Sequence, residues 1–304
     1  EDINNFVGAG ECSAVCCEKK FEKEISEGVS VFSFEEIRKL ASADTAIDFE
    51  AVDGIEIKKD EMRVLIFTSG TTGSSKGVCL SQHNICSNIH STVSMVKVKK
   101  SDRVLSILPL HHTYESTLDC LLILSRGTSI TYAESLRTVA KNVKEYSPTI
   151  LVVVPELLKF LASRLKSGIL QQCPKKYCEL FENNSLGVAL KKLPLPVRLV
   201  IRNKVRKNLG GKLRLFIVGA AALDTSLVDD FAALGIRTLQ GYGLTECSPL
   251  LAGNNDFFMN PRSTGVAIPG VQLKIDEPNS EGIGEILAKG ENIMLGYYKD
   301  PVRT

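Results

Sequence analysis

The stretch "VLIFTSGTTGSSKG", Val64–Gly77, joins an apolar run to a loop of glycines, hydroxyl side chains and one lysine. The apolar residues at its start are typical of a short buried strand. Glycines let backbone N–H groups converge on an anion, hydroxyls add donors, and Lys76 adds a positive charge. The stretch therefore predicts a phosphate-binding loop directly after a strand.

This loop does not have the spacing of a Walker A loop. That motif requires Gly immediately before the lysine and Ser or Thr immediately after it. Here Ser75 precedes Lys76, and Gly77 follows it. A segment rich in Gly, Ser and Thr can also be a flexible linker. The preceding strand and the lysine favour phosphate binding by a different kind of nucleotide loop.

Apolar runs alternate with amphipathic stretches along most of the chain. The expected strands are residues 13–17, 64–67, 103–108, 128–131, 149–154, 213–218 and 237–240. Helices are expected between them, with Ser81 as the N-cap of one and Asp224 as the N-cap of another. The alternation predicts an α/β fold of mostly parallel sheets flanked by helices.

From about residue 261 the pattern changes to short apolar segments separated by Gly and Pro. This pattern predicts the start of a small β-barrel-like subdomain over residues 261–304. We expect residues 61–260 to form the α/β core and residues 1–60 to end a preceding α/β subdomain. The chain begins with Glu1 rather than Met, so we interpret it as part of a longer protein.

The composition narrows the class of protein. The 304 residues are 44% hydrophobic and 24% charged, which is ordinary for a globular protein. The net charge of +2 is too small to indicate a nucleic-acid partner. No run reaches the roughly 18 apolar residues of a membrane span. Nine cysteines without a CxxC pair favour reduced thiols, and therefore a cytoplasmic protein, over a zinc site or disulfides.

A basic segment stands apart from this balance. No acidic residue occurs between Glu182 and Asp224, and Arg198, Arg202 and Arg206 recur every four residues. Apolar residues alternate with them at positions 197, 201, 205 and 209, which predicts an amphipathic helix. Its basic face is either solvated or in peripheral contact with an anionic membrane surface.

Two more stretches accompany the glycine-rich loop. "LPLHHTYE" occupies Leu108–Glu115, and "QGYGLTECSP" occupies Gln240–Pro249. With "TSGTTGSSKGV", they resemble the gate motif, the adenine and magnesium motif, and the phosphate loop of adenylate-forming enzymes, above all long-chain fatty acid–CoA ligases. That family usually has proline where this chain has Ser75. The resemblance covers residues 63–304 and implies that this chain is part of the family's large AMP-binding domain.

The resemblance implies a role for each motif residue. The loop that would wrap the β- and γ-phosphates of ATP consists of Ser69, Gly70, Thr71, Thr72, Gly73 and Lys76. Thr68 and Glu246 would hold Mg²⁺, and Thr245 would bind the α-phosphate. Tyr242 would stack on adenine. The small residues that would leave room for the ligands are Gly219, Ala220, Ala221, Gly241 and Gly243.

The catalytic residues implied by the resemblance are Lys76, His112, Thr245 and Glu246. His112 would orient the acid or gate its pocket rather than act as a general base, because a fatty carboxylate is already ionised at neutral pH. A lone histidine is more often structural, but its place in the motif favours function. We expect Cys247 to be a packed thiol and not a nucleophile.

The implied activity is activation of a medium- to long-chain fatty acid by ATP as an acyl-adenylate, with release of pyrophosphate and transfer to CoA. Two alternatives stay open: an adenylation module that loads a carrier protein, and a non-catalytic homologue that binds nucleotide or lipid. Relatives carry a ribose-binding aspartate and a C-terminal domain with a catalytic lysine beyond the point where this sequence stops. We therefore expect this chain alone to lack full turnover.

Overall fold

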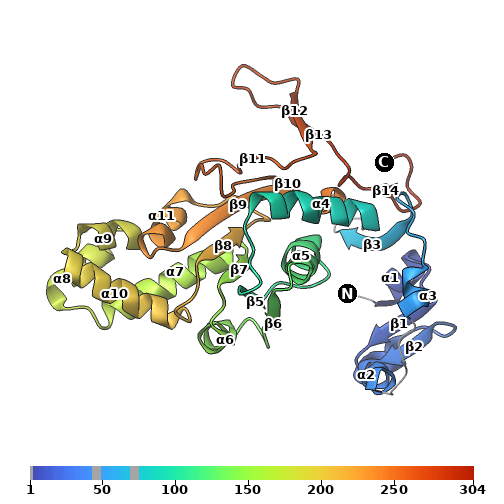
Figure 1. Cartoon of the computed structure of the whole chain (residues 1–304), viewed down its shortest axis with the longest axis horizontal. Helices are drawn as coiled ribbons and strands as arrows, with labels where there is room; N and C mark the ends of the chain where they lie inside the picture. The colour runs from blue at the N-terminus through green and yellow to red at the C-terminus, as the bar shows by residue number, and fades with distance from the viewer. Residues whose placement is uncertain (1–2, 43–48, 69–74) are drawn as a thin grey trace. The chain divides into compact units, whose positions relative to one another are not determined.

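The computed structural model describes residues 3–42, 49–68 and 75–304. The chain forms two compact units: unit 1 comprises Glu1–Gln82 with Leu295–Thr304, and unit 2 comprises His83–Met294. Figure 1 shows the elements of both units. The expected division at residues 60 and 260 stays a prediction.

Unit 2 is built on a seven-stranded sheet with the order β11-β10-β9-β8-β7-β5-β6. Its five parallel strands are β5 (Arg103–Ser106), β6 (Ser129–Tyr132), β7 (Ile150–Val153), β8 (Leu215–Val218) and β9 (Arg237–Gly243). β10 (Leu250–Gly253) and β11 (Val266–Ala267) extend the sheet antiparallel. The predicted α/β fold with a mostly parallel sheet is confirmed.

The sheet has an apolar core on each face. Side chains of β8 alternate between the faces: Phe216 and Val218 belong to one core, and Leu215 and Ile217 contact the other. Both faces are buried, which explains why these strands are continuous apolar runs.

Helices cover both faces. Those that contribute to the first core are α6 (Val139–Tyr146), α7 (Pro155–Leu170), α8 (Lys175–Glu182), α9 (Leu186–Lys192), α10 (Leu195–Asn208) and α11 (Thr225–Ala233). Those that contribute to the second are α4 (Gln82–Met95), the π-helix η2 (Tyr114–Leu121) and α5 (Leu122–Ser125). Figure 1 shows α7, α8, α9 and α10 gathered at one end of unit 2.

Two expected helix starts can be compared with the structure. The Asp224 carboxylate accepts a hydrogen bond from the backbone N–H of Ser226 at 2.8 Å, so the predicted N-cap of α11 is confirmed. α4 begins directly after Ser81, at the expected residue.

The predicted basic helix is confirmed as α10, but its arginines are not a free face. Val205 and Leu209 are buried in the first core, and Val197 packs against it. Arg206 Nη1 donates hydrogen bonds to the carbonyl oxygens of Leu234 and Gly235, both at 3.1 Å. These carbonyls follow α11, whose C-terminal end favours a cation.

Arg202 lies at the same end of α11. A Cβ atom added to Gly235 would come within 2.5 Å of Arg202 Nη2, so this guanidinium lies directly against the glycine. Arg198, Arg202 and Arg206 are all half-buried. The structure therefore gives two of the three arginines a place in the packing of unit 2, and membrane contact through all three stays a prediction.

Unit 1 combines two small sheets with short helices. Its helices are α1 (Ile3–Ala9), η1 (Lys19–Glu24), α2 (Phe34–Ser42) and α3 (Phe49–Asp53). β1 (Ala14–Cys17) and β2 (Ser30–Ser33) are parallel. β3 (Met62–Thr68) pairs antiparallel with β4 (Lys76–Ser81), which also pairs with β14 (Gly296–Tyr297).

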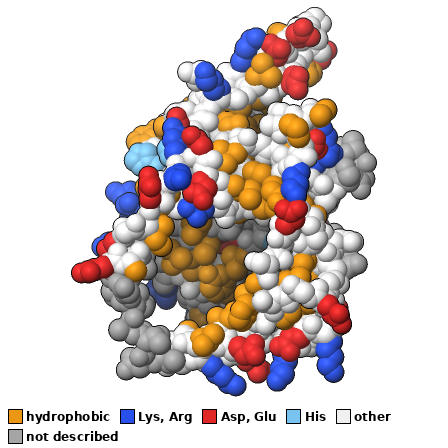
Figure 2. Space-filling model, turned by 90° about the vertical axis from the view of Figure 1, so that its right-hand side faces the viewer, with side chains coloured by type: hydrophobic (Ala, Val, Ile, Leu, Met, Phe, Trp, Pro, Cys, Tyr) orange, Lys and Arg blue, Asp and Glu red, His pale blue; other side chains and the backbone are white. Residues whose placement is uncertain are grey.

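The residues after 261 form short strands, as expected. β11 joins the large sheet, β14 joins unit 1, and β12 (Gln272–Asp276) pairs with β13 (Glu285–Lys289) as an antiparallel hairpin. Within the described ranges, no helix has the length and apolarity needed to cross a bilayer. On the face drawn in Figure 2, basic and acidic side chains are interspersed among hydrophobic ones, in keeping with the small net charge.

Candidate functional site

The residues on either side of the glycine-rich stretch pair as antiparallel strands in unit 1. β3 ends at Thr68, β4 begins at Lys76, and these two residues are paired in register. Both are half-buried, and the Lys76 ammonium lies 5.0 Å from the centroid of the Tyr297 ring. The other predicted loop residues, Ser69, Gly70, Thr71, Thr72 and Gly73, lie outside the described part of the chain.

Close packing fixes the start of β4 beside this loop. A Cβ atom on Gly77 would lie 3.0 Å from Leu65 Cδ1 and 3.1 Å from Tyr298 Cβ. Glycine is therefore needed here for close approach of the strands, which is separate from any contact with phosphate.

The adenine and magnesium motif lies at the end of β9 in unit 2. Tyr242 and Gly243 close the strand, and Thr245 and Glu246 follow in the 3₁₀ turn η3 (Thr245–Cys247). A Cβ atom on Gly243 would come within 1.8 Å of the Pro249 carbonyl oxygen. Only glycine allows the two ends of this loop to approach so closely.

Two buried asparagines hold the same loop. The Asn88 side chain donates to the carbonyl oxygens of Cys247 at 3.1 Å and Leu250 at 2.8 Å. Asn292 donates to the same two oxygens at 2.8 and 3.0 Å. Met294 N–H donates to the Glu246 carbonyl at 2.8 Å. Sequence reasoning missed both asparagines, since no motif contains them; an asparagine on the buried face of α4 was the available signal.

Cys247 is unsuited to nucleophilic attack. It is buried, and burial followed by the neighbouring Glu246 charge raises the pKa of its thiol to about 12. The thiolate is the nucleophilic form of cysteine. A thiol that stays protonated at neutral pH supports the expectation of a packed side chain.

The small residues after β8 lie against the gate motif. A Cβ atom on Gly219 would come within 3.0 Å of Tyr114 Cζ, and the Tyr114 hydroxyl donates to the Ile217 carbonyl at 3.1 Å. Ala220 follows with a left-handed φ of 70°. The structure therefore brings the segment after His112 to the carboxyl end of β8, where Gly219, Ala220 and Ala221 begin the next loop.

His112 is exposed and is part of the turn before η2. Its ring centroid lies 4.2 Å from that of His111. Partial burial, followed by the neighbouring His111, lowers the pKa of His112 below its ordinary value. A neutral imidazole can donate a hydrogen bond from its ring N–H to the carboxylate of a substrate.

A buried acidic pair follows on the π-helix. Ser106 Oγ donates to Glu115 Oε1 at 2.5 Å, and Asp119 is also fully buried. Burial raises the pKa of Glu115. Burial, followed by the Glu115 charge, raises the pKa of Asp119 well above its usual range. Neither carboxyl is placed to meet a ligand at the surface.

An apolar cavity of about 40 Å³ lies between the two motifs of unit 2. Leu118 and Leu122 line one side, and Ile217 and Leu239 line the other. Gly241, near the end of β9, also lines the cavity. Tyr114 also lines the cavity, and its hydroxyl is held by the hydrogen bond to the Ile217 carbonyl oxygen.

The predicted magnesium ligands are a hydroxyl and a carboxylate. Oxygen donors of this kind suit Mg²⁺, which is a hard cation. Both Thr68 and Glu246 are half-buried, the first in unit 1 and the second in unit 2. The described ranges contain no cluster of three or more His, Cys, Asp or Glu that could hold a metal. A hydroxyl and a carboxylate are therefore suitable ligands for an Mg²⁺ ion that is also bound by the phosphate oxygens of ATP.

The comparison with protein families identifies the chain. Its residues 6–298 match the family model described as AMP-binding enzyme. The chain belongs to the AMP-binding enzyme family.

The chain is similar to curated relatives over part of their length. Human long-chain-fatty-acid–CoA ligase 1 is 32% identical over 270 residues, which are 81% of this chain and 37% of that protein. Mouse long-chain-fatty-acid–CoA ligase 5 is 30% identical over 263 residues, 81% of this chain and 38% of that protein. The chain thus spans less than two-fifths of the length of these two relatives.

Solved structures share the AMP-binding fold. Apo MatB from Rhodopseudomonas palustris aligns with a TM-score of 0.73 and 24% identity, over 99% of this chain and 55% of that one. O-succinylbenzoate coenzyme A synthetase from Bacillus subtilis, in complex with AMP, gives a TM-score of 0.69 and 19% identity, over 99% and 68%. These similarities support the fold assignment.

Proposed function

We propose that the protein to which this chain belongs activates a medium- to long-chain fatty acid with ATP and transfers the acyl group to CoA. The fatty carboxylate attacks the α-phosphorus, the bond to the β-phosphate breaks, and pyrophosphate leaves. The CoA thiol then loses its proton and attacks the acyl carbonyl, and AMP leaves. Membership of the AMP-binding family and similarity to two long-chain-fatty-acid–CoA ligases support this proposal.

The observation that carries the substrate class is the similarity to long-chain-fatty-acid–CoA ligases, and the apolar cavity of unit 2 is in keeping with an apolar substrate. Its lining includes four leucines and one isoleucine, together with Gly241 of β9, the strand that leads into the Thr245–Glu246 turn. A hydrocarbon chain in this cavity would place its carboxylate towards the loop that follows β9. Because the cavity has a volume of about 40 Å³, a long hydrocarbon chain requires more space than the cavity offers in this structure.

The residues of the chain would act mainly through charge and orientation. Acid and ATP are both anions, so positive charge and oriented donors lower the barrier to their reaction. Lys76 and the loop before it would bind the β- and γ-phosphates, and Thr245 the α-phosphate. Thr68 and Glu246 would hold Mg²⁺, which offsets the negative charge of the phosphates when bound. Tyr242 would stack on adenine, and His112 would orient the carboxylate.

The environment of Glu115 bears on the carrier-loading alternative. An amino-acid substrate needs an acidic side chain to pair with its ammonium group, and Glu115 is the candidate in the gate motif. Its side chain is fully buried against Ser106, and its pKa is raised. This environment favours a substrate without an ammonium group.

We also propose a cytoplasmic location, because the nine cysteines are free and reduced thiols are usual there. A peripheral contact with an anionic membrane through α10 is part of the same proposal.

ATP–pyrophosphate exchange by the intact parent protein tests the substrate class. A panel of fatty, aromatic and amino acids should give exchange with medium- and long-chain fatty acids, and little with the others. Exchange with an amino acid alone would favour the carrier-loading module. A complete absence of exchange with every acid, despite ATP binding, would favour the non-catalytic homologue.

A further inference from the structure

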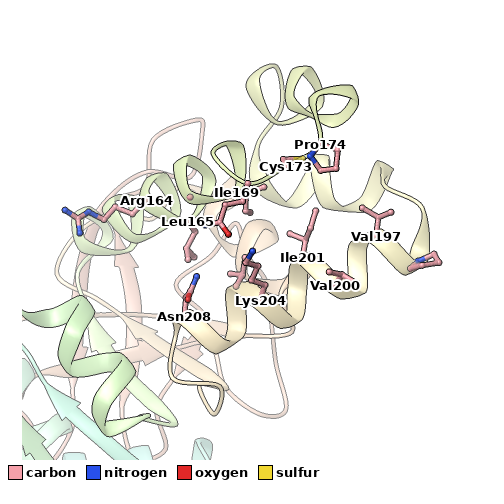
Figure 3. Close-up of a pocket in the computed structure, with 14 residues that line it drawn as sticks. Arg164, Leu165, Ile169, Cys173, Pro174, Val197, Val200, Ile201, Lys204 and Asn208 are labelled. Carbon is pink, nitrogen blue, oxygen red and sulfur yellow. The ribbon is translucent and has the colours of Figure 1, made fainter.

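Helices α7 and α10 enclose a second apolar groove in unit 2, with a volume of about 390 Å³. Its floor is formed by Leu165 and Ile169 of α7 and by Val197 and Ile201 of α10. Figure 3 shows these side chains lying between the two helices. The volume falls within the range of about 300–1,000 Å³ that is usual for small-molecule sites.

The rim of the groove is cationic. Arg164 and Lys204 line it, and none of its lining residues is acidic. Figure 3 shows the Lys204 side chain directed from α10 towards α7. Among the described residues, no ion pair or hydrogen bond involves the Lys204 ammonium. The groove therefore combines an apolar floor with an exposed ammonium group, that of Lys204, which is available to pair with an anion.

This groove is separate from the candidate acyl cavity. The residues that line it on α10 are followed by the loop that enters the start of β8. The predicted nucleotide residues instead follow the carboxyl ends of β8 and β9. Since these strands are parallel, the groove lies towards their amino ends and the predicted nucleotide residues lie towards their carboxyl ends.

We propose that the α7–α10 groove binds one molecule of a single-chain anionic amphiphile, a free long-chain carboxylate. The hydrocarbon chain lies on the apolar floor, and the carboxylate pairs with Lys204 at the rim. An uncharged chain would leave the ammonium without its partner, and a small anion such as phosphate would leave the apolar floor exposed. The combination of the two surfaces specifies an amphiphile.

The alkylation rate of Cys173 measures occupancy of the groove, because this cysteine lines it. Dodecanoate, kept below its micellar concentration, is added to the intact parent protein, and alkylation of individual cysteines by iodoacetamide is followed by peptide mass spectrometry. At about ten times the dissociation constant, the alkylation rate of Cys173 should fall about tenfold, because only the unoccupied fraction reacts. Cys86, exposed on α4 and outside the groove, should react at an unchanged rate.

A pair of charge reversals on α10 supplies the control. Lys204→Glu should weaken protection of Cys173 about tenfold, since a charge-assisted contact becomes a repulsive one. Lys207→Glu changes the net charge equally on the same helix but does not line the groove, so protection should persist. Continued resistance of the buried Cys247 thiol to alkylation in both variants shows that unit 2 remains folded.

Three results would overturn the proposal. The first is the absence of protection by dodecanoate. The second is equal protection by 1-dodecanol, or protection that survives Lys204→Glu, because either result removes the role of the anion. The third is protection by anionic phospholipid vesicles but not by dodecanoate, which would assign this surface to a bilayer instead.

Discussion

Glu246 and Cys247 are neighbours in the chain, but their surroundings give them different chemistry. The Cys247 thiol is buried, and its pKa is about 12. Glu246 is half-buried in the same turn, and its backbone is held by Met294. The turn therefore leaves the Glu246 side chain partly exposed and buries the Cys247 thiol. This arrangement suits a site that binds a metal ion and forms no covalent intermediate on cysteine.

Replacement of Glu246 tests its proposed role. In the intact parent, Glu246→Gln should reduce acid-dependent release of pyrophosphate by about 100-fold, since loss of one strong electrostatic contact costs about 3 kcal/mol. Lys76→Ala should have a smaller effect, because the backbone donors of the loop remain. Glu281→Gln, at an exposed residue between β12 and β13, is the matched control. Unchanged activity in Glu246→Gln would remove the magnesium assignment.

Asp102 and Arg214 form an ion pair that joins the starts of two strands. Asp102 is 4% exposed, and Arg214 Nη2 and Nε donate to its two oxygens at 2.6 and 3.0 Å. Burial alone would raise the pKa of Asp102. Hydrogen bonds from Arg214, the Lys99 backbone and Thr149 outweigh burial and hold the pKa below its ordinary value.

Replacement of Arg214 should show how much an unpaired buried carboxylate lowers the free energy of unfolding. Arg214→Ala should reduce the free energy of unfolding by about 3 kcal/mol at neutral pH. Lys274→Ala, which breaks the exposed pair with Asp276, should cost about 1 kcal/mol or less. Urea denaturation measures both.

The pH dependence of the same comparison follows from the lowered pKa of Asp102. A carboxyl group with a lowered folded-state pKa adds stability above its unfolded pKa, which is about 3.9. That stability is lost as the pH falls through the folded-state pKa. The difference between wild type and Arg214→Ala should therefore be largest near neutrality and shrink below about pH 4. A difference that grows on acidification would contradict this account.

At the scale of elements, the 3₁₀ turn after β9 depends on α4 and on the segment before β14. Asn88 and Asn292 come from these two places and donate to the same two carbonyl oxygens, those of Cys247 and Leu250. Because each oxygen has two donors, loss of one asparagine leaves both carbonyls partly satisfied. Loss of both leaves two buried acceptors without partners.

This arrangement predicts coupling between the two asparagines. Asn88→Ala and Asn292→Ala should each destabilise unit 2 by about 1 kcal/mol, and the double variant by more than the sum of the two. A double-mutant cycle in urea denaturation measures the coupling. Strict additivity would mean that the two asparagines support the turn independently.

Elements with strong periodic patterns could be predicted from the sequence. The parallel strands, α10 and the Asp224 cap were all expected, since apolar spacing and capping residues are local signals. β4 was not expected as a strand, because its residues, "KGVCLS", combine a lysine, a glycine and a serine with few apolar side chains. The π-helix η2 and the antiparallel addition of β10 depend on tertiary packing, which no local pattern encodes.

At the scale of the whole molecule, the motifs of the candidate site divide between two units. Thr68 and Lys76 belong to unit 1, while His112, Tyr242, Thr245 and Glu246 belong to unit 2. The sequence predicted these residues because family motifs are contiguous. It could not identify Asn88, Asn292 or the place of Tyr114 in the apolar cavity of unit 2, because these contacts join segments far apart in the chain. Tyr114 packs against Gly219, about a hundred residues away.

Single-turnover chromatography of the intact parent tests the central claim most directly. With ATP, Mg²⁺ and a long-chain fatty acid but no CoA, the account predicts formation of acyl-adenylate and an equal amount of pyrophosphate. Addition of CoA should convert the adenylate to acyl-CoA and AMP. Release of ADP and inorganic phosphate, or binding of ATP with no acyl-adenylate formed, would contradict the account.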